Sequence, residues 1–197
     1  MAEFVYAIVY DDSENFASFV KNTKGYFFSN PKQPGSGSVN ANPNGNLHGA
    51  GKFAFPGGGL KSGEDEFTGA IREFLEETNY DLTGKYTDSF SLNRLSGKHT
   101  YYGVYFCVDN LSDIVSTVTT NLAAGQNAAT DIQAGTITSY GAIYTKYPDC
   151  PPDNELATVA TWNLETDETK IKQLNSDTDT DWFWDILDYL HDAKFSS

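Results

Sequence analysis

The sequence predicts a mixed α/β (α+β) fold, on three observations. The chain has 197 residues, which is the length of one domain. Its composition, 39% hydrophobic and 14% aromatic, is that of a protein with a folded core. Short apolar runs bounded by turn residues alternate with stretches of helical periodicity, without a strict βαβ repeat. We therefore expect a single domain that spans residues 1–197.

The predicted strands are short apolar runs. Residues 4–9 and 16–20 are separated by the polar turn 11–15, a pattern typical of a β-hairpin. Further strands are predicted at residues 53–56, 101–109, 136–145 and 157–164.

Three helices are predicted from apolar spacing. The first covers residues 64–78, with Ser62 or Gly63 before it and Asn79 after it. The second starts near Leu111 and runs to Gly125, although its β-branched residues weaken that interpretation. The third is C-terminal and carries apolar residues at helical spacing, Phe183, Ile186, Leu187 and Leu190.

A long loop is expected at residues 30–50, because this stretch is rich in Gly, Pro, Asn and Ser and cannot bury much apolar area. Only about 30 residues precede it, too few for an independent domain. We therefore interpret it as an insertion within one domain. Together with residues 110–134, it is expected to shape a specificity pocket.

The charge balance limits the possible partners. Thirteen basic and 27 acidic residues give a net charge of −14, which argues against binding to duplex nucleic acid. An acidic protein can still bind phosphorylated molecules when a divalent cation lies between the two. No apolar run is long enough to span a membrane, and the N-terminus does not resemble a secretion signal. With Cys107 expected to be buried and Cys150 to be an ordinary thiol, we expect a cytoplasmic protein without a disulfide.

The first predicted helix carries the residues best suited to chemistry. At helical spacing Glu73, Glu76 and Glu77 share one face, while an apolar stripe that includes Phe74 and Leu75 faces the core. Like charges this close repel one another, and a hard divalent cation would resolve the repulsion. The three glycines ahead of the helix, residues 57–59, permit close backbone approach to a phosphate or a metal.

This arrangement resembles the Nudix box, here spanning Gly58 to Tyr80. The box reads Gly, five residues, Glu, seven residues, Arg-Glu-hydrophobic, one residue, Glu-Glu, one residue, Gly-hydrophobic. The chain matches it in register at Gly58, Glu64, Arg72, Glu73, Phe74, Glu76, Glu77 and Tyr80. It departs at Asn79, where the family has Gly; Asn is the next best residue for the left-handed conformation at a helix end. The resemblance implies the family's α/β/α sandwich around a mixed sheet.

The resemblance also implies roles for individual residues. Metal ligands for Mg²⁺ or Mn²⁺ would be Gly57, through its carbonyl, with Glu73, Glu76 and Glu77. Glu73 or Glu76 would accept a proton from the attacking water, and Glu155 is the candidate for a further catalytic acid outside the box. Glu64 and Arg72 would support the helix. Candidate substrate-binding residues near the box are Lys52, Gly58, Lys61 and Arg94.

The function that the resemblance implies is hydrolysis of a phosphoanhydride bond in a small phosphorylated molecule. The favoured substrate is a nucleoside diphosphate linked to another group, such as a nucleotide sugar, a dinucleotide or a capped RNA end. Two alternatives stay open: a diphosphoinositol polyphosphate phosphohydrolase, and a non-catalytic module that senses a nucleotide. Tyr101, Tyr102 and Tyr140 are candidates for stacking on a base, although such residues are more often part of a sheet face. The sequence leaves the oligomeric state open.

Overall fold

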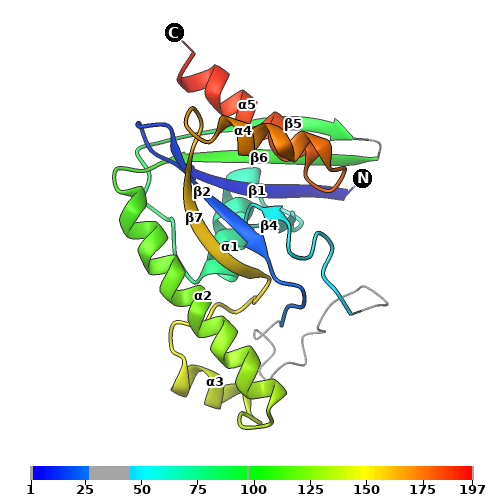
Figure 1. The fold of residues 1–197 in the computed structure, drawn as a ribbon, viewed down its shortest axis with the longest axis vertical. Coiled ribbons are helices and arrows are strands. Elements are labelled where there is room, and N and C mark those ends of the chain that lie inside the picture. Colours follow the sequence, from blue (N-terminus) through cyan, green and yellow to red (C-terminus); the bar gives the residue numbers. More distant parts are fainter. Residues whose placement is uncertain (1, 27–44, 97, 197) are drawn as a thin grey trace.

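The computed structural model describes residues 2–26, 45–96 and 98–196. Most of the loop expected at residues 30–50 lies outside the described residues, because the gap covers 27–44. Figure 1 shows the arrangement of the elements. In chain order they are β1 (Ala2–Tyr10), β2 (Asn15–Lys21), β3 (Phe53–Ala54), β4 (Gly57–Gly59), α1 (Glu66–Thr78), β5 (Asp88–Ser96), β6 (His99–Cys107), α2 (Leu111–Gln133), α3 (Tyr140–Lys146), β7 (Leu156–Asn163), α4 (Glu168–Gln173), the 3₁₀ turn η1 (Leu174–Ser176) and α5 (Asp181–Lys194).

The strands form one mixed sheet with β1 in its middle. On one side β1 pairs in parallel with β6 along its whole length. On the other side it pairs with β2 only at Tyr10↔Phe16, and β4 takes the place next to it from Phe4 to Tyr6. The remainder of β2 pairs with β3 and β7. The glycine strand β4 therefore lies between two strands that diverge, directly ahead of α1.

Helices cover both faces of this sheet. Alternate residues of β1 point to opposite faces, as the pleat of a strand requires. Val5 and Val9 pack in a core under α1 and α2, while Ile8 and Tyr10 pack in a second core under α4 and α5. The α/β/α sandwich expected from the sequence is confirmed.

Two of the sequence predictions were wrong in this region. Residues 136–145 are not a strand: α3 occupies Tyr140–Lys146 and buries Ile143 in a small third core against the C-terminal half of α2. A short run with few apolar residues does not distinguish the two periods, which is why the strand prediction failed. The second predicted helix continues past Gly125 to Gln133. Strand β5 and helix α4 were not predicted.

Gly125 is inside α2 because another segment packs closely against it. A Cβ atom at this position would lie 2.9 Å from Asn154 Oδ1 and 3.3 Å from Pro151 Cδ. The loop before β7 therefore lies directly on the helix surface, which only a glycine allows. This contact helps to fix the position of Asp153 and Glu155, which belong to the same loop.

The ends of α1 are defined by two capping residues. Asp65 accepts a hydrogen bond from Thr68 N–H at 2.7 Å as the N-cap. Asn79 adopts the left-handed conformation with φ 53°, and its N–H bonds to the Leu75 carbonyl. The departure from the expected Gly thus keeps the geometry of the helix end.

Replacing Asn79 therefore has a predictable effect on stability. Asn79→Ala is expected to lower the free energy of unfolding by about 1 kcal/mol, because alanine is strained in the left-handed conformation that this position adopts. Asn79→Gly is expected to be neutral within about 0.5 kcal/mol, because glycine adopts this conformation freely. Urea unfolding of both variants measures the difference, and equal stabilities would contradict the strain argument.

Both cysteines are buried and free. The expectation of an ordinary thiol at Cys150 was wrong: burial raises the pKa of this thiol to about 12. Burial also raises the pKa of Cys107. Within the described residues, none of the helices has the length and apolar character needed to cross a membrane.

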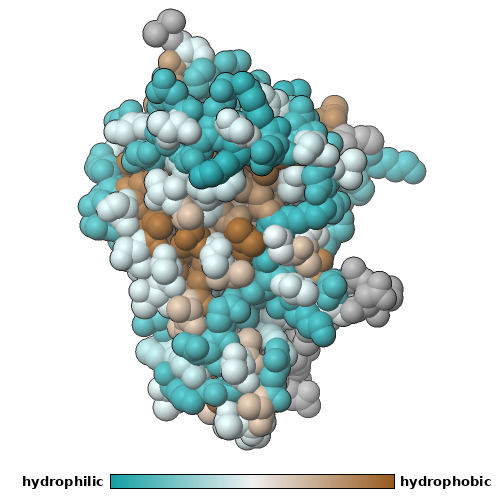
Figure 2. Space-filling model, viewed as in Figure 1, coloured by the Kyte–Doolittle hydropathy of each residue, from teal (hydrophilic) through white to brown (hydrophobic). Residues whose placement is uncertain are grey.

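Figure 2 shows apolar side chains gathered in the middle of one face, where Figure 1 places β2 and β7. Val20 of β2, 38% exposed, is among the large hydrophobic residues that reach the surface. Hydrophilic side chains surround this region.

Candidate active site

The acidic face of α1 is turned partly into the protein. Phe74 is fully buried in the core, as the sequence predicted, whereas Leu75 is 37% exposed and is not a core residue. Glu73 and Glu77 are only 8% and 2% exposed, and the side chain of Glu76 is 37% exposed. Two of the three carboxylates predicted to share one helix face are therefore buried.

Arg72 connects the acidic residues of the box. Its Nε and Nη2 donate to the two carboxylate oxygens of Glu64 at 2.8 and 3.0 Å. Its Nη1 donates to Glu73 at 2.7 Å and to Glu76 at 3.1 Å, and Nη2 also reaches the Gly59 carbonyl at 3.0 Å. A bidentate pair of this kind fixes the position of both side chains. The supporting role predicted for Glu64 and Arg72 fits this geometry and stays a prediction.

Glu77 faces β4 across the sheet edge. Its Oε1 accepts a hydrogen bond from Gly57 N–H at 3.1 Å, whereas its buried Oε2 has no partner within the described part of the chain. Gly58 lies against Glu73, since a Cβ atom at Gly58 would come within 2.8 Å of Glu73 Oε1. The glycines thus allow the backbone of β4 to lie directly on two of the carboxylates.

Asp153 is a site residue that sequence reasoning missed. Its N–H donates to the Glu76 carbonyl at 2.8 Å, so the loop before β7 is attached to the second half of α1. Its buried Oδ1, like Glu77 Oε2, lacks a partner within the described residues. Asp153 is two residues from Glu155 in the chain, but no spacing relates it to the box, so only the fold could reveal the contact.

Glu155 lies in the same cluster and is paired. Its Oε2 is 2.8 Å from Lys21 Nζ of β2, and its carbonyl accepts a hydrogen bond from Asn22 N–H. Although burial disfavours the charged lysine, Glu155 and Glu77 raise the pKa of Lys21. Lys21 is thus the cation that pairs with Glu155, and no local pattern predicted it because it lies in β2, far from the box in the chain.

The cluster is electrostatically unfavourable without a ligand. Burial, followed by the charges of Asp153 and Glu155, raises the pKa of Glu77 well above its usual range. Burial, followed by Glu155 and Glu73, likewise raises the pKa of Asp153. Burial also raises the pKa of Glu73, against the opposing effect of Arg72.

The donor set fits a hard divalent cation. Carboxylate and carbonyl oxygens are the ligands that Mg²⁺ and Mn²⁺ prefer, and two buried carboxylate oxygens in this cluster lack partners among the residues that the structure describes. Within the described ranges, no three Asp, Glu, His or Cys side chains are already grouped around a common point.

Residues 40–124 match the family model described as the NUDIX domain. These residues contain the whole box, β4 and α1, so the match and the carboxylate geometry concern the same segment. Residues 40–124 are thus identified as a NUDIX domain.

Solved structures of Nudix proteins resemble this chain in fold. A NUDIX hydrolase from Nitrosomonas europaea aligns at 14% identity with a TM-score of 0.50, covering 98% of this chain and 90% of that one. A MutT from a study of Aliivibrio salmonicida and Vibrio cholerae aligns at 14% identity, and the MutT protein of Methanosarcina mazei at 18%, each with a TM-score of 0.32 over 54% of this chain. The chain spans 63% and 62% of the lengths of these two MutT proteins. No curated protein sequence matches it.

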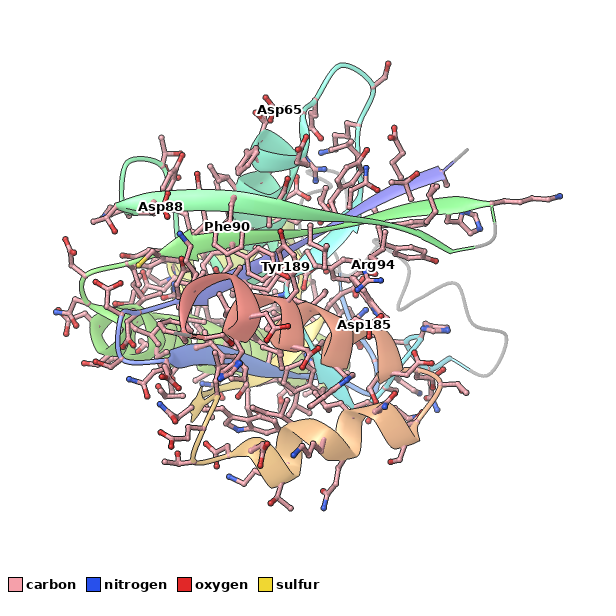
Figure 3. All side chains as sticks on the ribbon, turned by 90° about the horizontal axis from the view of Figure 1, so that it is seen from above. Asp65, Asp88, Phe90, Arg94, Asp185 and Tyr189 are labelled. Atoms are coloured by element: carbon pink, nitrogen blue, oxygen red, sulfur yellow. The ribbon has the colours of Figure 1, made fainter. Side chains whose placement is uncertain are left out.

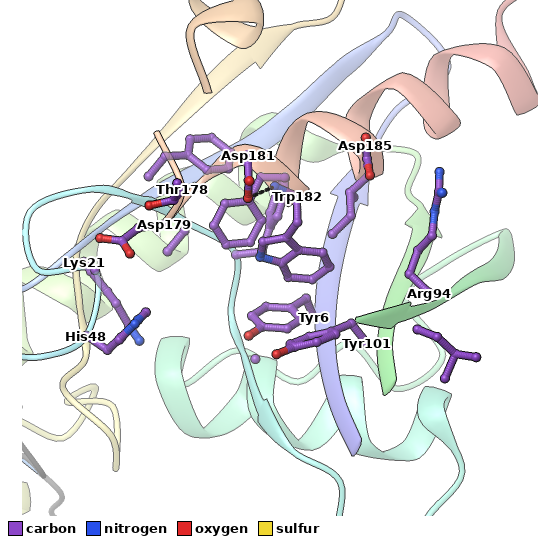
Figure 4. A pocket seen from close by; sticks show the side chains of 18 residues that line it. Tyr6, Lys21, His48, Arg94, Tyr101, Thr178, Asp179, Asp181, Trp182 and Asp185 are labelled. Carbon is purple, nitrogen blue, oxygen red and sulfur yellow. Dashed lines mark hydrogen bonds between the residues drawn. The ribbon is translucent and has the colours of Figure 1, made fainter. Parts of the chain in front are cut away.

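A pocket of about 560 Å³ adjoins the Nudix box (Figure 4). Gly57 and Lys21 line it at the end next to the carboxylate cluster. The aromatic rings of Tyr6, Tyr101 and Trp182 lie between this end and the side where Arg94 is found. Its volume is in the range of pockets that hold a small molecule.

The pocket is built by elements from both ends of the chain. Tyr6 comes from β1 and Trp182 from α5, the helix that Figure 3 shows lying across β5 and β6. From the segments expected to shape specificity, His48 and Gly49 line the pocket, but no residue of 110–134 does. Residues 111–133 form α2, which packs on the other face of the sheet, and their part in specificity stays a prediction.

The predicted substrate-binding residues lie in different places. Arg94 lines the pocket. Lys52 does not line it: its Nζ lies between Asp177 and Asp179, at 2.8 and 2.7 Å. Lys61 Nζ is 3.2 Å from Glu76 Oε1 at the outer side of the box.

The aromatic residues predicted to stack on a base also differ in position. Tyr101 lines the pocket, whereas the hydroxyl of Tyr102, the next residue of β6, donates a hydrogen bond to Glu3. Trp182, which was not predicted, also lines the pocket.

Proposed function

We propose that this Nudix protein is a divalent-metal-dependent pyrophosphohydrolase. Its substrate would be a nucleoside diphosphate linked to another group, such as a sugar, a second nucleotide or a capped RNA end. The observation that carries this proposal is a pair of buried carboxylate oxygens, of Glu77 and Asp153, that have no partner in the described part of the chain. They lie beside Gly57, at one end of a pocket large enough for a nucleoside. We also propose that residues 1–197 form one domain, because both main cores are built on the same sheet.

The residues that would hold Mg²⁺ or Mn²⁺ are Glu73, Glu76 and Glu77, together with the Gly57 carbonyl. A bound ion would neutralise phosphate oxygens and lower the pKa of a water molecule. Glu73 or Glu76 would accept the proton of that water as its oxygen bonds to one phosphorus. The bond from this phosphorus to the bridging oxygen breaks, and the bridging oxygen leaves with the second phosphate.

The charge of the pocket favours this substrate over a diphosphoinositol polyphosphate. Three aspartates, Asp179, Asp181 and Asp185, line the pocket, and they would repel a ligand with many phosphates. Tyr101 and Trp182 instead offer ring surface to a base or another flat group.

The cost of the buried acids favours an enzyme over a module that only senses nucleotides. Buried carboxylates without partners destabilise a fold, so a site that had lost its metal would gain stability by replacing Glu77 or Asp153. The chain has both, together with every acidic position of the box.

A substrate panel tests the proposal. Nucleotide sugars, dinucleotides, capped dinucleotides, inositol pyrophosphates and nucleoside triphosphates are incubated with the protein and Mg²⁺, and again with EDTA. Release of a mononucleotide or a sugar phosphate only in Mg²⁺ is the expected result. Absence of any turnover, with nucleotide binding retained, would favour the sensing module instead.

A comparison of two variants tests the acid outside the box. Glu155→Gln is expected to lower kcat at saturating Mg²⁺ by about tenfold or more, because Glu155 lies in the carboxylate cluster at the end of the pocket. Asp149→Asn, an exposed acid of the same loop, is the control and is expected to have no effect. Full activity of Glu155→Gln combined with loss of activity in Asp153→Asn would assign the role to Asp153.

A further inference from the structure

The two ends of the pocket differ in charge. At the end beside the box, the Gly57 backbone and Lys21 adjoin the carboxylate cluster that would bind metal and diphosphate. The opposite wall is formed by the start of α5 and is acidic, with Asp181 and Asp185. Because that wall repels phosphates, the part of a substrate that reaches it is not a phosphate.

The acidic wall surrounds an aromatic surface. Asp181 and Asp185 are one helical turn apart and lie on the same face of α5. Both line the pocket, as does Trp182. The indole contacts Tyr6 at 4.5 Å and Tyr101 at 5.4 Å between ring centroids. Figure 4 shows the three rings side by side, below the two carboxylates.

The two carboxylates of this wall, Asp181 and Asp185, are available to a ligand. Asp179, which also lines the pocket, is instead paired with Lys52. Asp181 accepts a hydrogen bond only from the N–H of Trp182, at 2.7 Å, and Asp185 has no hydrogen bond or ion pair within the described residues. Arg94 lies on the same side as Asp185 in Figures 3 and 4 and can offset one of the two charges. The unpaired charges of the wall therefore still sum to a negative value.

Aromatic rings flanked by carboxylates are suited to one kind of ligand. The face of an indole or phenol ring attracts a cation, and a nearby carboxylate adds a direct charge interaction. Neutral sugars gain little from such a wall, and anionic groups are repelled by it. On the basis of the proposed function, we infer that the group attached beyond the diphosphate carries a fixed positive charge. Its chemistry is that of an N-alkylated nucleobase or a quaternary ammonium group.

Two pairs of ligands that differ mainly in this charge test the inference. The first pair is 7-methyl-GDP and GDP, and the second is CDP-choline and CDP-glycerol. Dissociation constants are measured by tryptophan fluorescence in EDTA, where binding is separated from hydrolysis, and kcat/KM is measured in Mg²⁺ with those ligands that are hydrolysed. The cationic member of at least one pair is expected to bind about fivefold more tightly than its neutral counterpart. A preference in the first pair only indicates an alkylated base, and a preference in the second only indicates a quaternary ammonium group.

Variants of α5 connect the preference to the acidic wall. The double variant Asp181→Asn/Asp185→Asn is expected to reduce the preference to less than about twofold, as is Trp182→Leu. The charge-matched control is Asp188→Asn/Asp192→Asn, two exposed residues of the same helix outside this pocket, which is expected to keep it. Both double variants change only exposed carboxylates and are expected to fold. They therefore test the inference even if Trp182→Leu does not fold.

Equal binding within both pairs, or a preference that persists in Asp181→Asn/Asp185→Asn, would overturn the inference. The outcome is distinguishable from failure of the proposed function. Mg²⁺-dependent hydrolysis without any preference for the cationic ligand defeats the inference alone. A preference in EDTA without hydrolysis in Mg²⁺ supports the inference and defeats the proposed activity.

Discussion

Glu77→Gln is expected to lower turnover by at least about tenfold while the protein remains folded. Glutamine has nearly the same volume, and its carbonyl can still accept the hydrogen bond from Gly57 N–H at the position now held by Glu77 Oε1. What the variant loses is the charge needed to hold a divalent cation. In the metal-free protein that loss removes repulsion from Asp153 and Glu155, so its stability is expected to stay the same or to rise.

Thermal unfolding with and without Mg²⁺ separates the two effects. The wild-type protein is expected to gain stability from Mg²⁺, because the ion would bind only the folded cluster. Glu77→Gln is expected to show most of this gain lost. Glu66→Gln removes a carboxylate from the first turn of the same helix and is expected to behave as wild type. Unchanged hydrolysis in both Glu77→Gln and Glu76→Gln would contradict the assignment of the site.

Gly58→Ala is expected to reduce turnover by about a hundredfold, because a shift of about 1 Å in a reacting group can have that effect. A Cβ atom at this position would lie 2.8 Å from Glu73 Oε1 and 2.9 Å from its Cδ and Oε2. The Glu73 carboxylate would have to move away from β4, and its contact with Arg72 would change. The backbone of Gly58 needs no left-handed conformation, so the expected defect is in activity rather than in folding.

The neighbouring glycine provides a matched control. A Cβ atom at Gly59 meets nothing within 4 Å, so Gly59→Ala is expected to keep activity within about twofold of wild type. Steady-state kinetics and urea unfolding of both variants would measure activity and stability side by side. Equal activities would show that the close approach of β4 to Glu73 has no catalytic role.

Much of the fold could be predicted because its signals are local. The apolar runs of β1 and β2 and the helical spacing of α1 and α5 each lie within a few residues of sequence. Predictions failed where local signals were weak: residues 136–145 became α3, and α2 continued through Gly125 because another segment packs on that glycine. The burial of Glu73 and Glu77 was also not predicted, since it depends on how β4 lies against α1.

The sequence by itself determined the Nudix box, the helix that carries the acidic residues and the common face of Glu73, Glu76 and Glu77, because the pitch of a helix relates residues three and four positions apart. The tertiary structure alone decided that Asp153 and Lys21 join this face and that Trp182 of α5 completes the pocket. These residues lie more than 40 positions from the acidic helix in the chain, and only the packing of both helix layers on one sheet brings them together.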